Sequence, residues 1–287
     1  MPSITTRLTD ASERLSEHGL WLFAVIPLLS SILGFSNARK LLAADISFHV
    51  GITFGFPLPV TDPWSFVSTS VGGGAQVTGP ATPAAIGLLA IGIVIQSILL
   101  AGYLGGVRDG LRGEHPDFVG AVQSQFVPFL GFSIVLLTLA VPPMLFALAS
   151  GSLTAVVLLW LPVYVLISYL FYATPYLIVL HDVGLGRALR WSLSLATGGG
   201  EHLRYALGYA VLVAVVSVPA TVVVANLGVL GILLGIFVLS PVGLVFDTAT
   251  LLFIADSTDV AGLGTMSAGE RRQDASASLD PDADSAE

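Results

Sequence analysis

Six long apolar runs constrain this chain more than any other feature of its sequence. A helix needs about 20 mostly apolar residues to cross the roughly 30 Å hydrocarbon core of a bilayer. The runs cover residues of about 20–36, 83–107, 127–149, 153–180, 205–225 and 229–255. The first run is short but can be extended at both ends. The pattern predicts an all-α fold, in which residues 1–255 form a polytopic membrane helix bundle of about six transmembrane helices.

The composition supports this prediction. Hydrophobic residues make up 54% of the 287 residues and charged residues only 10%, whereas about a quarter of an average soluble domain is charged. The low charge indicates that much of the surface faces lipid. Cysteine is absent, which excludes disulfides, thiolate metal sites and a cysteine nucleophile.

The net charge of −8 is concentrated at the C-terminal end. Residues 256–287 contain eight acidic side chains and two arginines, a net charge of −6. Such a composition predicts a disordered acidic tail, and the acidic balance argues against a nucleic-acid partner. Lys40 is the single lysine. The low lysine content and the acidic tail together suggest that the protein comes from a halophilic archaeon, in which acidic surfaces keep proteins soluble. A GC-rich genome gives much the same composition.

The basic residues predict the orientation in the cell membrane. With six spans, nine Lys or Arg residues fall on the side of both termini and two, Arg39 and Lys40, on the other. Because cytoplasmic loops are enriched in Lys and Arg, both termini are expected in the cytoplasm. The nine are Arg7, Arg14, Arg108, Arg112, Arg187, Arg190, Arg204, Arg271 and Arg272. Residues 37–82 then form the one long outer loop.

Residues 46–56, with the sequence ISFHVGITFGF, alternate apolar side chains with small or polar ones. This period of two is typical of a half-buried β-strand. Since an open strand edge cannot face lipid, we expect a small extracytoplasmic β-cap whose apolar face is buried on the outer helix ends, with Trp64 at the interface. An irregular loop, or a strand that pairs only in an oligomer, is the alternative. The same loop is a candidate surface for a membrane-protein or envelope partner.

Three polar side chains lie within the predicted spans or at their ends: Gln96, Asp247 and Asn226. An ionised carboxylate inside a span is costly, so Asp247 is expected to face the bundle interior with a partner. One interpretation is a proton or cation site, and the other is a hydrogen bond between packed helices. The candidate partners are Gln96, Tyr172 or Tyr209 for the first, and Thr248, Thr250 or a cytoplasmic arginine for the second.

Residues 181–205 carry apolar side chains at helical spacing, with Arg187 and Arg190 on the flanking faces. This pattern predicts an amphipathic helix on the inner membrane surface whose arginines contact lipid phosphates. Arg108 and Arg112, in the preceding cytoplasmic loop, are expected to make the same contact.

Two hairpins share a short pattern. A Tyr-Leu pair begins at Tyr103 and again at Tyr176, and an aspartate, Asp109 or Asp182, follows six residues after each tyrosine. The two tyrosines are 73 positions apart. This offset would match spans two and three to spans four and five as a parallel repeat. Three matched positions are equally compatible with chance.

The sequence contains no catalytic or metal-binding motif. Its five histidines include no i, i+4 pair and no HExxH, so no metal site is expected. Residues 184–186, GLG, follow no strand and belong to no phosphate-binding motif, and the serines occur without GxSxG or SxxK. We therefore expect neither enzymatic activity nor a cofactor.

Two local patterns resemble known families. FHVGITFGFP followed by DPWSFVS resembles an uncharacterised haloarchaeal family of six-span integral membrane proteins, over most of the chain. FYATPYLIVLHDVGLGRALRWSLSL is similar to a helix–loop pattern of prokaryotic multi-pass proteins, including the membrane domain attached to some glycerophosphodiester phosphodiesterases. The matching positions are Pro175, Asp182, Ala188, Leu189 and Ser192. Both resemblances imply a multi-pass protein and no particular activity, because the acid- and His-rich phosphodiesterase barrel is absent.

Two functions are compatible with these features. The first is a non-enzymatic accessory or structural membrane component in contact with the lipid bilayer. The alternative is a small permease-like carrier that uses the embedded Asp247. Charged side chains inside the membrane often mark transport pathways. Transporters usually have more than one such group, so the single Asp247 favours the structural or accessory component. A water-filled path to Asp247 would favour the carrier, and a sealed, glycine-packed bundle the structural component.

Overall fold

The computed structural model describes residues 3–43, 48–57, 59–68, 83–150, 153–260 and 263. Within these residues the protein is entirely helical or irregular, without a β-strand. The long helices are α4 (Pro83–Leu111), α5 (Phe118–Ser150), α6 (Leu153–Phe171), α9 (Gly200–Asn226) and α10 (Gly228–Ser257). The shorter ones are α1 (Ile4–Glu17), η1 (Leu20–Ala24), α2 (Val25–Leu33), α3 (Phe35–Ala43), η2 (Pro63–Phe66), α7 (Thr174–His181) and α8 (Leu185–Gly198).

The number of apolar helices agrees with the prediction. Five helical stretches are long and apolar enough to cross a membrane, and a sixth is obtained if a bent pair counts as one span. The five are Leu89–Leu111, Phe118–Pro143, Leu159–His181, Gly200–Asn226 and Gly228–Ser257. The bent pair joins Ile4–Glu17 to Leu20–Ile32 at 114°. An all-helical architecture with five or six apolar helices is therefore confirmed for the described residues.

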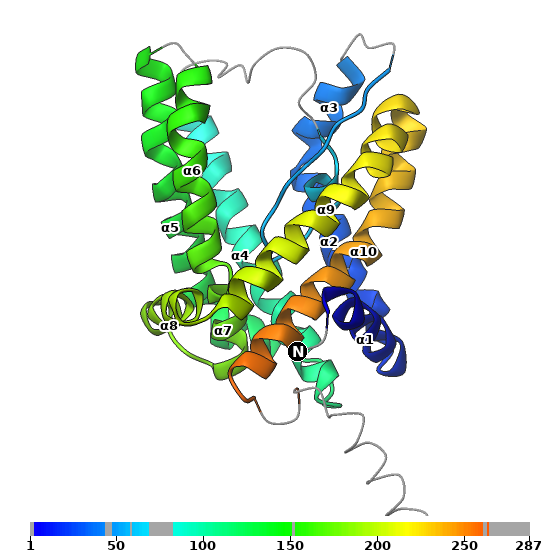
Figure 1. Ribbon diagram of the computed structural model, residues 1–287, viewed down its shortest axis with the longest axis vertical. Coiled ribbons are helices and arrows are strands. Elements are labelled where there is room, and N and C mark those ends of the chain that lie inside the picture. The colour runs from blue at the N-terminus through cyan, green and yellow to red at the C-terminus, as the bar shows by residue number, and fades with distance from the viewer. Residues whose placement is uncertain are drawn as a thin grey trace, which may run out of the picture.

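The helices form two groups that meet at one end of the molecule. Figure 1 shows α4, α5 and α6 on one side and α2, α3, α9 and α10 on the other. Helix α7 contacts α4, α5 and α10, so it joins the groups near the end where the N-terminus lies. Helices α1 and α8 lie at this same end, whereas α3 lies at the opposite end. We use inner end for the end with α1 and α8 and outer end for the end with α3, as names of place in the bundle.

Helix α1 is amphipathic and packs its buried face on α10. On that face Arg7 is only 3% exposed; it forms an ion pair with Asp256 at 2.7 Å and lies 5.1 Å from the ring centroid of Phe253. The Arg14 guanidinium donates a hydrogen bond to the carbonyl of Leu263 at 3.2 Å. These contacts hold the C-terminal end of α10 against α1.

The same contacts correct the start of the predicted disordered tail, residues 256–287. Asp256 and Ser257 still belong to α10, and Leu263 is fully buried. The buried Arg7 needs a carboxylate partner, which explains why Asp256 is ordered. Residues 261–262 and 264–287 lie outside the described residues, so the prediction for most of the tail is untested.

After α3 the chain enters the bundle instead of staying at its outer end. We define residues 48–57 and 59–68 as the re-entrant segment. Its first part, the descending arm 48–57, passes between α4 and α9 (Figure 1). His49 lies beside Asn226 at the outer end of α9, and Thr61 lies beside Tyr209, seventeen residues earlier in that helix. Seventeen residues of helix extend about 25 Å, so the segment penetrates most of the bundle. Its second part, the return arm 59–68, leads back outward.

The predicted strand over residues 46–56 and the outer β-cap are not confirmed. Residues 46–47 lie outside the described residues. Residues 48–56 are not assigned to a strand, and their recorded backbone hydrogen bonds go to helix side chains. The orientation is also reversed, because the polar alternate positions face the helices and the apolar ones are exposed. The physical reason is that α9 presents polar side chains, which satisfy backbone groups that would otherwise be unpaired inside the bundle.

Candidate functional site: a polar cluster around Asp247

The best-defined polar site surrounds Asp247 in α10. This side chain is only 2% exposed and accepts every hydrogen bond recorded for it from two residues. The Thr61 backbone N–H donates to both carboxylate oxygens, at 3.1 and 2.9 Å, and the Thr61 hydroxyl donates at 2.5 Å. The Tyr103 hydroxyl of α4 donates at 2.8 Å. The carboxylate therefore ties α10 to both α4 and the return arm.

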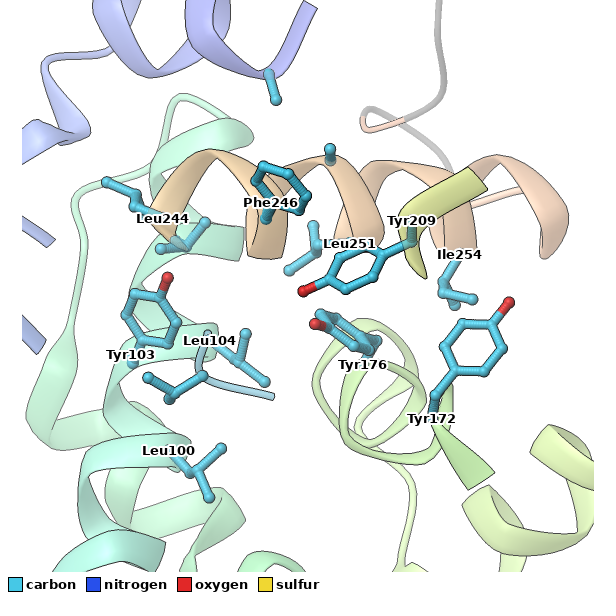
Figure 2. Packing of buried hydrophobic residues seen from close by; sticks show 14 of the residues in the cluster. Leu100, Tyr103, Leu104, Tyr172, Tyr176, Tyr209, Leu244, Phe246, Leu251 and Ile254 are labelled. Atoms are coloured by element: carbon cyan, nitrogen blue, oxygen red, sulfur yellow. The ribbon is translucent and has the colours of Figure 1, made fainter. Parts of the chain in front are cut away.

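Tyrosine hydroxyls extend this cluster across the bundle. The Thr61 and Tyr209 hydroxyl oxygens are 2.9 Å apart. Because the Thr61 hydroxyl already donates its proton to Asp247, Tyr209 is the donor of this bond. Figure 2 shows that Tyr103 comes from α4, Tyr176 from α7 and Tyr209 from α9, with the hydroxyls of Tyr176 and Tyr209 both directed toward the side of α4. Four helices and the return arm thus converge here.

A glycine in α10 allows this close approach. Gly243 lies one helical turn before Asp247, and a Cβ atom added to it would overlap the Thr61 carbonyl oxygen. Any larger side chain would push the return arm away from α10. Small residues at helix interfaces let backbones approach closely, and here the partner is an irregular segment instead of a helix.

Polar side chains of α9 bind the outer part of the segment. The Asn226 amide accepts a hydrogen bond from the His49 N–H and donates one to the His49 carbonyl, both at 2.7 Å. The Asn226 amide thus bonds both backbone groups of His49, as a neighbouring β-strand would do in a sheet. Farther along, the Ser217 hydroxyl accepts from the Thr53 N–H at 2.9 Å.

The return arm uses the same helix. The Thr221 hydroxyl accepts from the Ser68 N–H at 2.9 Å, and His49 Nε2 lies 3.2 Å from the Ser68 carbonyl oxygen. The last contact joins the two arms near the outer end of α9. A ladder of polar groups on α9 and α10 therefore accompanies the segment along its whole depth.

The structure brings together only part of the residue set suggested by the sequence. Asp247 and Asn226 both bind the re-entrant segment, at its inner and outer ends, and Tyr209 belongs to the Asp247 cluster. Gln96 is half-buried on α4, two turns before Tyr103, and is not a recorded partner of Asp247. The Tyr172 hydroxyl is buried without a partner among the described residues.

Thr248 and Thr250, which the sequence suggested as hydrogen-bond partners of Asp247 between packed helices, are not its recorded partners either. The Thr250 hydroxyl bonds with Tyr205 at 2.9 Å and not with Asp247, while the Thr248 hydroxyl has no recorded partner. Sequence reasoning missed Thr61 and Tyr103. The glycines flanking Tyr103 at 102, 105 and 106 were a signal that α4 packs closely there. Thr61, which lies in an irregular segment, carried no such signal.

The four candidate phosphate-binding arginines lie in different settings. Arg108 is bonded to Asp109 at 2.6 Å and to the Val179 carbonyl at 2.8 Å, so it joins α4 to α7. Arg112 is half-buried. Arg187 and Arg190 lie on the exposed face of α8. Of the four candidates, only Arg187 and Arg190 are exposed.

The chemistry available at the Asp247 cluster is limited by its pairing. Both carboxylate oxygens are occupied by donors of the protein, so a bound cation or substrate would have to displace Thr61 or Tyr103. Within the described ranges no group of three His, Cys, Asp or Glu side chains could hold a metal ion. No protein-family model, curated protein or solved structure matches this chain.

Proposed function

We propose that this protein is a non-enzymatic, multi-pass component of the cell membrane with a structural or accessory role. In this role the helices act as a frame that holds the re-entrant segment in place. The observation that carries the proposal is the complete pairing of Asp247 by Thr61 and Tyr103. A carboxylate whose recorded bonds all come from buried groups of the protein, Thr61 of the return arm and Tyr103 of α4, supports a packing role more than a transport role.

The distribution of basic residues supports cytoplasmic termini. Helices α1 and α8, with Arg7, Arg14, Arg187 and Arg190, lie at one end, whereas α3, with Arg39 and Lys40, lies at the other. Because positive residues favour the cytoplasmic side, the end with α1 and α8 is assigned to the cytoplasm. The exposed Arg187 and Arg190 would then contact phosphates of the inner leaflet.

A second candidate function is a small carrier that uses Asp247. It is favoured by the hydroxyl-rich surroundings of the carboxylate, since Thr61 and Tyr103 donate to it and Tyr209 lies in the next layer. A carboxylate inside the membrane can bind and release a proton, and the hydroxyls would hydrogen-bond to it. This function requires that water reach Asp247 from at least one side.

Cysteine accessibility distinguishes the two functions, because the natural chain has no cysteine. Asp247→Cys is treated with a membrane-impermeant thiol reagent from each side of the membrane. Arg190→Cys, on the exposed face of α8, and Leu42→Cys, at a 49% exposed position of α3, are the labelling controls for the two ends.

We expect both controls to react, each from one side, and Asp247→Cys to be protected from both sides. Size-exclusion chromatography checks that each variant is folded. Labelling of Asp247→Cys from either side would show that water reaches the cluster and would favour the carrier. Labelling of Arg190→Cys from outside would contradict the proposed orientation.

A further inference from the structure

We propose that the re-entrant segment binds the hydrocarbon chain of a single-chain amphiphile, whose hydroxyl or carboxyl end bonds with Tyr172 and His202. The proposal concerns a surface separate from the Asp247 cluster. We define the apolar row as the alternate side chains of the descending arm that face away from α9. They are Phe48, Val50, Ile52, Phe54 and Phe56.

The apolar row is uncovered over most of its length. Phe48, Val50, Ile52 and Phe54 are 63%, 53%, 55% and 74% exposed, whereas Phe56 is half-buried. Large apolar side chains that gather at the surface mark sites that bind membranes, ligands or partners. Nine residues in extended conformation cover about 26 Å, a length suited to a long alkyl chain.

A line of aromatic rings continues from the inner end of the apolar row into the protein. The ring centroids of Phe56 and Tyr169 are 6.4 Å apart, as are those of Tyr169 and Tyr172, and the next pair, Tyr172 and His202, is 6.2 Å apart. The exposed fraction of the side chains is lower toward the buried end of this line. Phe54 is exposed, Phe56 and Tyr169 are half-buried, and Tyr172 and His202 are 5% and 6% exposed.

The buried end of this line carries two polar groups without a recorded partner. Tyr172 Oη and His202 Nε2 are both fully buried, and neither has a hydrogen-bond partner among the described residues. Leaving such groups unpaired costs free energy. Nearby Tyr205 differs, because its hydroxyl bonds with Thr250. Figure 2 shows the Tyr172 hydroxyl pointing away from Tyr176 and Tyr209, so it does not belong to the Asp247 cluster.

The chemistry of the two groups defines the end of the ligand. A tyrosine hydroxyl can donate and accept, and a neutral imidazole nitrogen can do either according to its tautomer. A hydroxyl or carboxyl group satisfies both. A phosphate would bring a larger charge, and the nearby cation, Arg7 above Phe253, is already paired with Asp256. A single alkyl chain with a small polar end therefore fits better than a phospholipid.

The test uses Phe54→Cys, labelled with a bimane fluorophore in lipid nanodiscs. The probe is stearic acid with a nitroxide quencher at carbon 12. We expect saturable quenching, and we expect that adding Tyr172→Phe weakens the apparent affinity about fivefold to tenfold, as the loss of one buried hydrogen bond predicts. Because Tyr172→Phe removes a hydroxyl without a recorded partner, the melting temperature of the protein should not fall.

Val127→Cys, at a 73% exposed position of α5, is the matched control for contact with the bulk bilayer. Its quenching should rise in proportion to the probe and should not change with Tyr172→Phe. Stearyl alcohol should compete with the probe, and methyl stearate should compete less well.

Three results would overturn the proposal. One is non-saturable quenching at Phe54→Cys, which would mean ordinary contact with the bilayer. Another is an affinity unchanged by both Tyr172→Phe and His202→Leu. The third is equal competition by methyl stearate, which would show that the polar end is not recognised.

Discussion

The two arms of the re-entrant segment contrast in how the helices enclose them. In the return arm Val60, Thr61, Trp64 and Phe66 are all buried, and the Trp64 indole donates a hydrogen bond to the Ser31 carbonyl at 2.9 Å. In the descending arm the alternate side chains Phe48, Val50, Ile52 and Phe54 are exposed. The return arm lies between α2, α9 and α10, whereas the recorded backbone hydrogen bonds of the descending arm go only to α9.

Alternation of apolar and polar residues in a sequence therefore does not identify which face of the segment is buried. At membrane depth an unpaired backbone group costs several kcal/mol. Asn226 and Ser217 supply partners for the backbone of His49 and Thr53, and this fixes the polar side of the descending arm toward the protein. The apolar side then faces outward, where lipid or another apolar molecule can cover it.

The largest expected effect comes from releasing the return arm. Asp247→Leu leaves the Thr61 N–H, the Thr61 hydroxyl and the Tyr103 hydroxyl without their acceptor, and we expect a loss of about 3–5 kcal/mol in the free energy of unfolding. Chemical denaturation in mixed micelles measures it. Asp247→Asn keeps one acceptor oxygen and should lose less. A loss below about 1 kcal/mol for the leucine variant would contradict the role given to Asp247.

A steric change at the same contact should have the next largest effect. Gly243→Ala places a methyl group against the Thr61 carbonyl, so it should destabilise the protein by about 1–3 kcal/mol. Gly92→Ala in α4 is the matched control, because a Cβ atom there meets no other atom within 4 Å. The control should be neutral or stabilising by up to about 1 kcal/mol. Similar melting temperatures for the two variants would refute the close contact.

The descending arm should be less sensitive than the return arm. Asn226→Ala removes both hydrogen bonds to His49, and we expect a loss of about 1–2 kcal/mol. It should also increase thiol labelling of a cysteine introduced at Thr53, which is half-buried on the side facing α9. Thr138→Ala, at an exposed position of α5, is the control. If Asn226→Ala changes neither the free energy of unfolding nor the labelling at position 53 more than this control does, the bidentate pairing does not hold the descending arm in place.

The smallest effect is expected at an amide that lacks such pairing. Gln125 in α5 is 1% exposed, and neither its Oε1 nor its Nε2 has a partner among the described residues. Gln125→Met keeps the shape and removes the unpaired groups, so stability should stay within about 1 kcal/mol of the natural protein or rise. Thermal unfolding followed by tryptophan fluorescence measures this. A loss as large as that of Asn226→Ala would show that Gln125 has a polar role.

The architecture could be predicted from the sequence because helices that cross lipid leave a local signal. Apolar runs of sufficient length predicted about six helices, and helical spacing predicted the amphipathic α8. Asp247 and Asn226 were also identified from the sequence, since a polar residue in or beside an apolar run is conspicuous. Each of these inferences depends on residues close together in the chain.

The partners of those polar residues could not be predicted in the same way. Thr61 and Asp247 are 186 positions apart, and His49 and Asn226 are 177 apart. The period of two over residues 46–56 indicated an extended conformation, but the face that it buries depends on the hydrogen-bonding groups that α9 presents. Local patterns in the sequence predict that these helices form and that Asp247 and Asn226 are polar positions in or beside the spans. The entry of an irregular segment into the bundle, where it pairs with them, is visible in the fold alone. Burial inside the bundle requires that every backbone group find a partner, but the packing of distant parts of the chain decides which partner that is.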